Sequence, residues 1–182
     1  MHTFVVVSGA PASGKTTLAK ALARELRFPH LDKDDFLERQ FSDRPVDAIE
    51  RAALSRLADT EFQRQALLKQ TTVLSSWWRH PHSTSDSGTP VAWLTSPTIM
   101  VVEVYCQCSA QLALKRFIER SRHPGHLDTT RSQEALLRQF QTALTLGPLF
   151  PIRSVVCNTD NQVSTTEVAA LGANVLQHVP LP

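Results

Sequence analysis

The sequence predicts an α/β fold, a three-layer sandwich in which helices cover both faces of a five-stranded parallel sheet. Short apolar runs alternate with amphipathic helical segments, and no internal repeat or low-complexity tract interrupts them. Polar clusters directly follow the apolar runs, at the sheet edge where such folds bind ligands. Because 182 residues suit one domain with its own core, we expect residues 1–182 to form a single domain.

The predicted strands are short and apolar, as is typical of strands buried on both faces. The first, at residues 4–7, reads Phe-Val-Val-Val and ends in a turn that contains glycine. The others are expected at residues 28–31, 71–75, 99–106 and 154–157.

Apolar residues three and four positions apart predict the helices. In the first helix, Leu18, Leu22 and Leu26 share one face. Ser109 is expected to cap a later helix, which Pro124 stops. The helices are expected at residues 15–27, 45–70 (where the pattern allows a break), 110–123, 131–144 and 165–177.

The composition argues against several classes of protein. A net charge of +2 does not favour nucleic acid as the main partner. No apolar run approaches the roughly 18 residues of a membrane helix, and the N-terminus enters a strand without a signal-peptide pattern. We therefore expect a cytoplasmic protein without membrane contact. Cys106, Cys108 and Cys157 are too few for a metal site and are expected in the core.

Residues 9–16, Gly-Ala-Pro-Ala-Ser-Gly-Lys-Thr, match the Walker A pattern and lie between the strand and the helix that this motif requires. Its glycines let backbone N–H groups point inward, and the N-terminus of the helix favours anionic oxygens. Lys15 can reach the β- and γ-phosphates, and the Thr16 hydroxyl can coordinate magnesium. We predict ATP and Mg²⁺ as ligands, bound by Gly9, Ala12, Ser13, Gly14, Lys15, Thr16 and Thr17.

Together with this loop, the segment Asp32-Lys33-Asp34-Asp35-Phe36 and the arginine-rich residues 116–126 resemble the small P-loop kinases of the nucleoside-monophosphate-kinase-like group. By motif, the sequence looks nearest to chloramphenicol phosphotransferase and the zeta-type toxin kinases. The resemblance covers about residues 4–171, and the phosphate loop is its specific part. It implies a P-loop NTPase fold, a small helical lid over about residues 117–130 and ATP-dependent phosphorylation.

In those relatives an aspartate after the second strand deprotonates or orients the acceptor hydroxyl, and Asp34 occupies the matching position. Phosphoryl transfer also needs a carboxylate close to an acceptor held in line. We therefore predict Asp34 as the catalytic base in contact with the acceptor, and Asp32 as a magnesium ligand through water. Asp35 should point elsewhere if the segment is extended. The alternatives are that these acids only cap the next helix, or that Asp32 is the base.

The related kinases carry lid arginines that close over the phosphates, and Arg116, Arg120 and Arg122 lie in the corresponding stretch. Arg116 and Arg120 are four apart and should share a helical face. Converging cations would neutralise the charge of the transition state. We predict Arg120 and Arg122 as catalytic, together with Lys15, and Arg116 as nucleotide-binding; for the arginines, the alternative is a solvated basic helix face.

The third predicted strand departs from the P-loop pattern, because residues 73–76 contain no Walker B aspartate. Magnesium would then depend on Thr16, phosphate, water and Asp32 or Asp34, which argues against a motor-type ATPase. Trp77 and Arg79 follow this strand and are predicted to contact the acceptor, with Arg79 on an anionic group. Since neighbours in an extended segment face opposite ways, one tryptophan of the Trp77-Trp78 pair is expected in the core.

The predicted function is transfer of the γ-phosphoryl group of ATP to a hydroxyl or phosphate of a small molecule. The alternatives are a nucleotide-dependent switch, in which the lid and the loop at residues 83–90 respond to the nucleotide, and a polynucleotide end kinase, which the modest net charge disfavours. No heptad seam predicts an oligomer.

Overall fold

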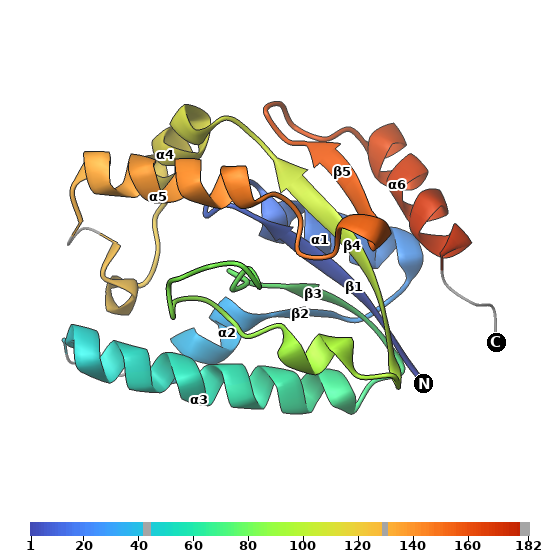
Figure 1. Ribbon diagram of the computed structural model, residues 1–182, viewed down its shortest axis with the longest axis horizontal. Coiled ribbons are helices and arrows are strands. Elements are labelled where there is room, and N and C mark those ends of the chain that lie inside the picture. The colour runs from blue at the N-terminus through green and yellow to red at the C-terminus, as the bar shows by residue number, and fades with distance from the viewer. Residues whose placement is uncertain (42–44, 129–130, 179–182) are drawn as a thin grey trace.

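The computed structural model describes residues 1–41, 45–128 and 131–178, and its centre is a five-stranded, all-parallel sheet in the order β2-β3-β1-β4-β5 (Figure 1). The fold class predicted from the sequence is therefore confirmed. The strands overlap the predicted ones with small differences at their ends. They are β1 (His2–Gly9), β2 (His30–Asp32), β3 (Thr71–Ser75), β4 (Ile99–Gln107) and β5 (Ser154–Asn158).

The helices form the outer layers of the sandwich. Helices α1 and α6 share a core with one face of the sheet, and α3 with the 3₁₀ turn η1 covers the other. Helices α4 and α5 pack together beside the phosphate loop. No helix among the described residues has the length and apolar composition needed to cross a bilayer. The helices are α1 (Lys15–Leu26), α2 (Lys33–Glu38), α3 (Ala48–Leu67), α4 (Ala110–Glu119), α5 (Gln133–Leu146) and α6 (Thr165–Gln177); η1 is Ala92–Thr95.

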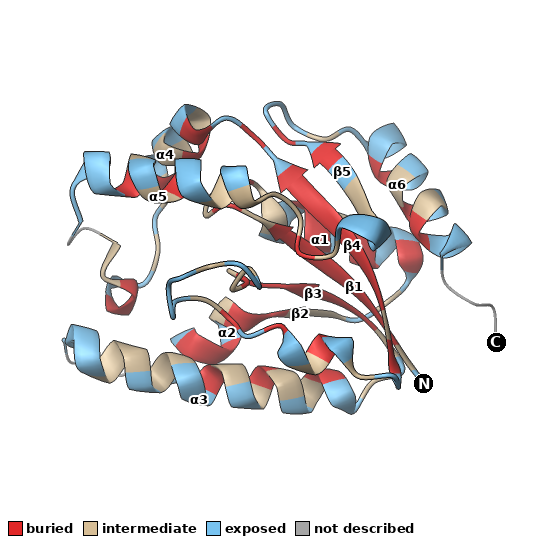
Figure 2. Ribbon diagram, viewed as in Figure 1, coloured by how far each residue is buried: buried red, intermediate tan, exposed pale blue. Residues whose placement is uncertain are grey.

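Strand β1 explains why the first apolar run is continuous. Phe4 and Val6 face the core beneath α3, whereas Val5 and Val7 face the core beneath α1. All four side chains are fully buried, and Figure 2 shows the central strands as the buried layer of the molecule. The three cysteines are also buried and free, as predicted.

Two segments differ from the expectation. The chain is extended only as far as Asp32, the last residue of β2, so the extended segment on which the expectation for Asp35 depended is absent. Helix α2 begins at Lys33, and the Asp32 side chain caps it by accepting from the Asp34 N–H at 3.0 Å. The predicted lid is mostly loop in its described part: α4 ends at Glu119, and the 3₁₀ turn Pro124–His126 follows. Residues 129–130 of the predicted lid lie outside the described residues.

Glu103 is a charged residue that is fully buried in the middle of β4. Its carboxylate accepts hydrogen bonds from the Ser8 hydroxyl and from the backbone N–H groups of Leu149 at 2.9 Å and Phe150 at 2.8 Å. A buried carboxylate requires such donors. Glu103 therefore ties the end of β1, just before the phosphate loop, to the segment that follows α5.

Replacing Glu103 by glutamine is expected to lower the free energy of unfolding by about 2 kcal/mol or more, because an amide NH₂ would face backbone N–H donors that need an acceptor. Urea unfolding measures the change. Glu119→Gln, an exposed position on α4, is the matched control and should change stability by less than about 0.5 kcal/mol. Equal stability of the two variants would contradict a structural role for the buried carboxylate.

Candidate functional site

The phosphate loop, residues 9–14, joins β1 to α1, and its glycines adopt backbone angles that other residues rarely reach. Gly9 has a φ of +132° and Gly14 a φ of +90°. L residues rarely adopt such angles, and a Cβ at Gly9 would collide with the backbone carbonyl of Cys106 on β4. The loop therefore wraps tightly in front of the N-terminus of α1, where helical N–H groups favour anions.

The residues predicted to bind phosphate separate into two sets. Gly9 and Ser13 shape the loop and are not among the residues that line the cleft: Ser13 is fully buried, and its N–H donates to the Ala10 carbonyl at 3.2 Å. The Lys15 ammonium also donates to this carbonyl, at 2.6 Å, which holds it over the loop. The others line an open cleft, which we call the phosphate cleft: Ala12, Gly14, Lys15, Thr16 and Thr17.

Burial lowers the pKa of Lys15 to about 8, because desolvation penalises the charged amine more than the nearby Asp34 and Asp32 stabilise it; Arg120 lowers this pKa further. Cys106 also lies close to Lys15, and burial raises the pKa of its thiol to about 12, so the thiol stays neutral at physiological pH. Lys15, at the start of α1, is therefore a residue of the phosphate cleft whose charge changes at a pH of about 8.

This lowered pKa predicts a pH dependence of nucleotide binding. Lys15 is charged below its pKa, so ATP affinity should be full below about pH 8 and should fall as the pH rises through this value, when the ammonium loses its proton. Equilibrium binding of ATP at pH values on both sides of 8 measures the effect. An affinity that is constant across this range would contradict it.

Thr16 and Asp32 form the part of the site that suits magnesium. The Thr16 hydroxyl donates to Asp32 Oδ2 at 2.8 Å, and the Ser75 hydroxyl donates to the same oxygen at 2.9 Å. The parallel register places Asp32 directly beside Ser75, so β2 supplies the carboxylate that β3 lacks. Hydroxyl and carboxylate oxygens are the ligands that Mg²⁺ prefers. The described residues contain no cluster of three acidic, histidine or cysteine side chains for a metal, so phosphate and water would complete the coordination.

Asp34 lies in a chain of charged groups that crosses the phosphate cleft. Arg122 donates to the Asp34 carboxylate with one nitrogen and to Asp128 Oδ2, at 3.4 Å, with another. Arg120 donates to the same Asp128 oxygen at 3.0 Å, and its guanidinium lies 4.1 Å from the centre of the Phe117 ring. Both predicted lid arginines are thus held by Asp128, which the sequence analysis did not identify.

Arg116 does not share a partner with Arg120, although both were predicted on one helical face. Its guanidinium donates to the backbone carbonyls of Thr159 at 2.7 Å and Asp160 at 2.9 Å. Arg116 therefore fixes the loop between β5 and α6, which also lines the cleft.

The tryptophan pair divides as predicted. Trp78 is buried, and its indole N–H donates to the Val7 carbonyl at 3.0 Å, whereas Trp77 lines the phosphate cleft. Arg79 differs from its prediction, because its guanidinium donates to Asp86 Oδ1 at 2.5 Å and to the Gly88 carbonyl at 3.4 Å. With these partners Arg79 fixes its own loop, and its contacts do not support the predicted role on an anionic acceptor.

The phosphate cleft has a volume of about 1030 Å³ and joins the phosphate loop to the acidic and basic groups around Asp34. Arg51 and Arg131 also line it, and neither was predicted. Burial lowers the pKa of Arg51, and the nearby charges of Arg122 and Arg131 lower it further. Three guanidinium groups therefore approach one another on the Asp34 side, which makes this side suitable for anionic groups.

Known proteins give a consistent match to this architecture. A family model described as an AAA domain matches residues 4–146. A protein from Chloroflexus aurantiacus, described provisionally as a kinase, is 25% identical, with a TM-score of 0.76 over 98% of this chain and 99% of that one. No curated protein matches the chain significantly.

Two further solved structures share the fold. A shikimate kinase from Bacteroides thetaiotaomicron has a TM-score of 0.61 at 18% identity, covering 96% of this chain and 97% of its own. A sugar kinase from Janibacter has a TM-score of 0.60 at 18% identity, covering 99% and 97%. The predicted relationship to small P-loop kinases is confirmed. Because the family model matches residues 4–146, most of this chain, the chain belongs to the AAA domain family. It has the fold of a P-loop kinase.

Proposed function

We propose that the protein is an ATP-dependent kinase that transfers the γ-phosphoryl group to a hydroxyl or phosphate of a small molecule. The observation that carries this proposal is that Asp34 lines the same cleft as the phosphate loop and pairs with Arg122. A phosphate loop alone fits many functions. A carboxylate and arginines in the same cleft favour transfer to an acceptor, because they supply a base and positive charge where the two substrates meet.

The nucleotide would lie along the cleft with its phosphates on the loop and on Lys15. Thr16 and Asp32 would hold Mg²⁺, which neutralises charge on the phosphates. The adenine ring of the nucleotide would lie toward the loop that Arg116 fixes, where Thr159 and Val163 line the cleft.

At the other end, an oxygen of the acceptor attacks the γ-phosphorus. The bond from that phosphorus to the oxygen of the leaving ADP breaks, and the electron pair leaves with ADP. For a hydroxyl acceptor, the proton passes to the Asp34 carboxylate, which is half exposed and so reachable from the cleft. Arg120 and Arg122 neutralise the charge of the transferring group. A base with these neighbours is typical of phosphoryl transfer.

The modest net charge of the chain, +2, favours a small molecule over nucleic acid as the acceptor. Asp34 and Asp128 offset part of the charge of the arginines in the cleft. Three buried, free cysteines suit the reducing cytoplasm, which we propose as the location.

The test is turnover of ATP to ADP with magnesium, with and without a panel of hydroxylated and phosphorylated small molecules, followed by mass spectrometry of the products; GTP is run in parallel. Acceptor-dependent turnover and a product heavier by one phosphoryl group would support the proposal. Tight ATP binding without transfer to any acceptor would contradict it and favour a nucleotide-dependent switch.

A further inference from the structure

A second pocket, of about 180 Å³, lies beside the phosphate cleft and shares Trp77 and Ser87 with it. Ser8 and Gly9, which lead into the phosphate loop, also line this pocket. We call it the side pocket. A molecule that it holds would therefore lie next to the phosphate loop, at the boundary with the cleft that Asp34 lines.

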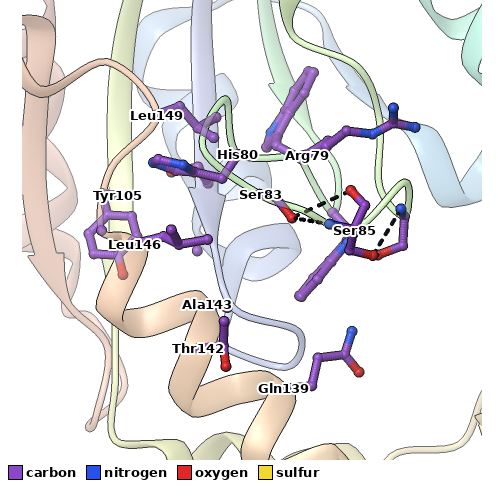
Figure 3. A pocket seen from close by; sticks show the side chains of 16 residues that line it. Arg79, His80, Ser83, Ser85, Tyr105, Gln139, Thr142, Ala143, Leu146 and Leu149 are labelled. Atoms are coloured by element: carbon purple, nitrogen blue, oxygen red, sulfur yellow. Dashed lines mark hydrogen bonds between the residues drawn. The ribbon is translucent and has the colours of Figure 1, made fainter.

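The two walls of the side pocket differ in chemistry. Figure 3 shows Tyr105, Leu146 and Leu149 gathered on one side, with Ser83 and Ser85 opposite them. The first wall is apolar, and the second presents hydroxyl groups on the loop of residues 80–87, which we call the serine loop. Helix α5 lines the pocket with residues three and four positions apart, which share one helical face. Gln139, Thr142 and Ala143 add polar and small groups, and Leu146 belongs to the apolar wall.

The lining of the side pocket is nearly neutral. Among the described residues that line it, none carries a carboxylate, and the guanidinium of Arg79 is paired with Asp86. His80 also lines the pocket, and both of its ring nitrogens have partners: Nδ1 accepts from the His82 N–H at 3.1 Å, and Nε2 lies 3.2 Å from the Pro148 carbonyl. Burial raises the pKa of Tyr105, so its phenol remains a neutral hydrogen-bonding group. A charged occupant would have no counter-ion here, so the pocket favours a neutral one.

Backbone hydrogen bonds and a glycine hold the serine loop in place along the pocket. The backbone N–H of Arg79 donates to the Thr89 carbonyl at 2.8 Å, and the backbone N–H of Thr89 donates to the Trp77 carbonyl at 2.7 Å. These two bonds join the ends of the serine loop. Gly88 has a φ of +95°, and a Cβ there would lie 2.6 Å from the Trp77 ring. The glycine therefore allows the indole of Trp77 to pack closely against the loop, where it lines both the pocket and the cleft.

The size of the pocket limits the occupant. A cavity of roughly 150 Å³ holds a benzene molecule, so about 180 Å³ holds one six-membered ring with small substituents. A saturated ring that bears several hydroxyl groups has an apolar C–H face and a polar rim, which match the two walls. A flat aromatic alcohol would leave the hydroxyl wall largely unused.

We propose that the side pocket holds the ring of the phosphoryl acceptor, and that this acceptor is a neutral, polyhydroxylated six-membered ring, a pyranose or a cyclitol. This inference rests on the proposed kinase function and specifies its acceptor. One hydroxyl of the ring extends past Trp77 to the phosphate loop and Asp34, while the others are bound by the serine loop and Gln139.

The test measures binding and transfer separately in the full chain. Direct binding is measured by calorimetry with glucose, galactose and myo-inositol, and with glycerol, 4-nitrobenzyl alcohol and glucuronate as open-chain, aromatic and charged probes. Transfer is measured with the same panel and magnesium-ATP. We expect binding of, and transfer to, at least one of the three neutral rings, and weaker binding of the other probes.

Two variants test the site. Ala143→Trp fills the pocket from α5, and Leu146→Ala removes part of its apolar wall. Each variant should raise the KM for the acceptor by about tenfold or more and leave the affinity for ATP unchanged. Gln141→Trp, an exposed position on the same helix that does not line the pocket, should leave the acceptor KM unchanged. ATP binding and thermal melting check that each variant is folded.

The outcomes separate this inference from the proposed function. Transfer with an unchanged acceptor KM in both pocket variants would overturn the side pocket and leave the kinase intact. Transfer to the aromatic or charged probe alone, or failure of all three neutral rings to bind, would overturn the acceptor class. Ring binding that Ala143→Trp abolishes, without any phosphoryl transfer, would support the pocket and overturn the kinase.

Discussion

Replacing Asp34 by asparagine is expected to lower the rate of phosphoryl transfer by about 10²–10⁴-fold, the usual contribution of a general base, with little change in ATP affinity. The asparagine keeps the shape of the side chain and one oxygen toward Arg122, but it cannot accept the proton of the acceptor hydroxyl. Asp34 caps no helix, since that role belongs to Asp32, and its carboxylate does not contact the phosphate loop through any hydrogen bond among the described residues. The kcat for transfer and the Kd for ATP measure the two effects separately.

Asp35→Asn is the matched control for this variant. Asp35 lies in the same first turn of α2, is exposed, and loses the same charge on substitution. Its variant should keep transfer close to the unchanged rate. Full transfer by Asp34→Asn would contradict the assignment of Asp34, and if Asp32→Asn then lost transfer at saturating magnesium, the base would be Asp32.

The residues that could be predicted from the sequence are those whose partners are local or whose position follows from a regular element. The phosphate loop is one continuous segment, and the division of Trp77 and Trp78 between cleft and core follows from the alternation of side chains in an extended chain. The position of Asp34 in the cleft could be predicted because it lies two positions after the end of β2, at the edge of the sheet where such folds bind ligands.

Other parts of the site depend on pairs that no local pattern indicates. Arg122 and Asp34 are 88 positions apart, and the Glu103 carboxylate binds the backbone of Phe150 47 positions later. Arg79 shows how a local partner competes with a predicted ligand: a basic residue after a strand suggests an anionic ligand, and in the structure Asp86, seven positions later, pairs with its guanidinium. A carboxylate in a following loop has to be considered before an arginine is assigned to a substrate.

The sequence left open whether the segment after β2 stays extended or begins a helix that its acidic residues cap. The structure has a helix there, since Asp32 accepts a hydrogen bond from the Asp34 N–H while its other oxygen accepts from Thr16. Capping and metal binding were considered as alternatives for Asp32. Its two oxygens face different partners, so the same side chain can cap α2 and still take part in the magnesium site.

Replacing Lys15 by alanine is expected to lower the rate of transfer by about 10²–10³-fold, the usual effect of removing one group that stabilises charge in the transition state, and also to weaken ATP binding. The ammonium is held over the loop by the Ala10 carbonyl, so it meets the phosphates without a rearrangement of the chain. The kcat for transfer and the Kd for ATP measure the two losses. Lys115→Ala, which removes an exposed lysine from α4, should leave both unchanged.

A pH titration of the Lys15→Ala variant shows whether the lost affinity belongs to the charge of this lysine. In the unchanged protein, ATP affinity should fall as the pH rises through about 8, where the buried amine loses its proton. In the variant this decrease should be absent, because Cys106 does not ionise in this range. If both proteins lose affinity equally as the pH rises, another group is responsible and the Lys15 ammonium is not the titrating phosphate ligand. If only the unchanged protein does so, the charge that binds the phosphates is that of Lys15.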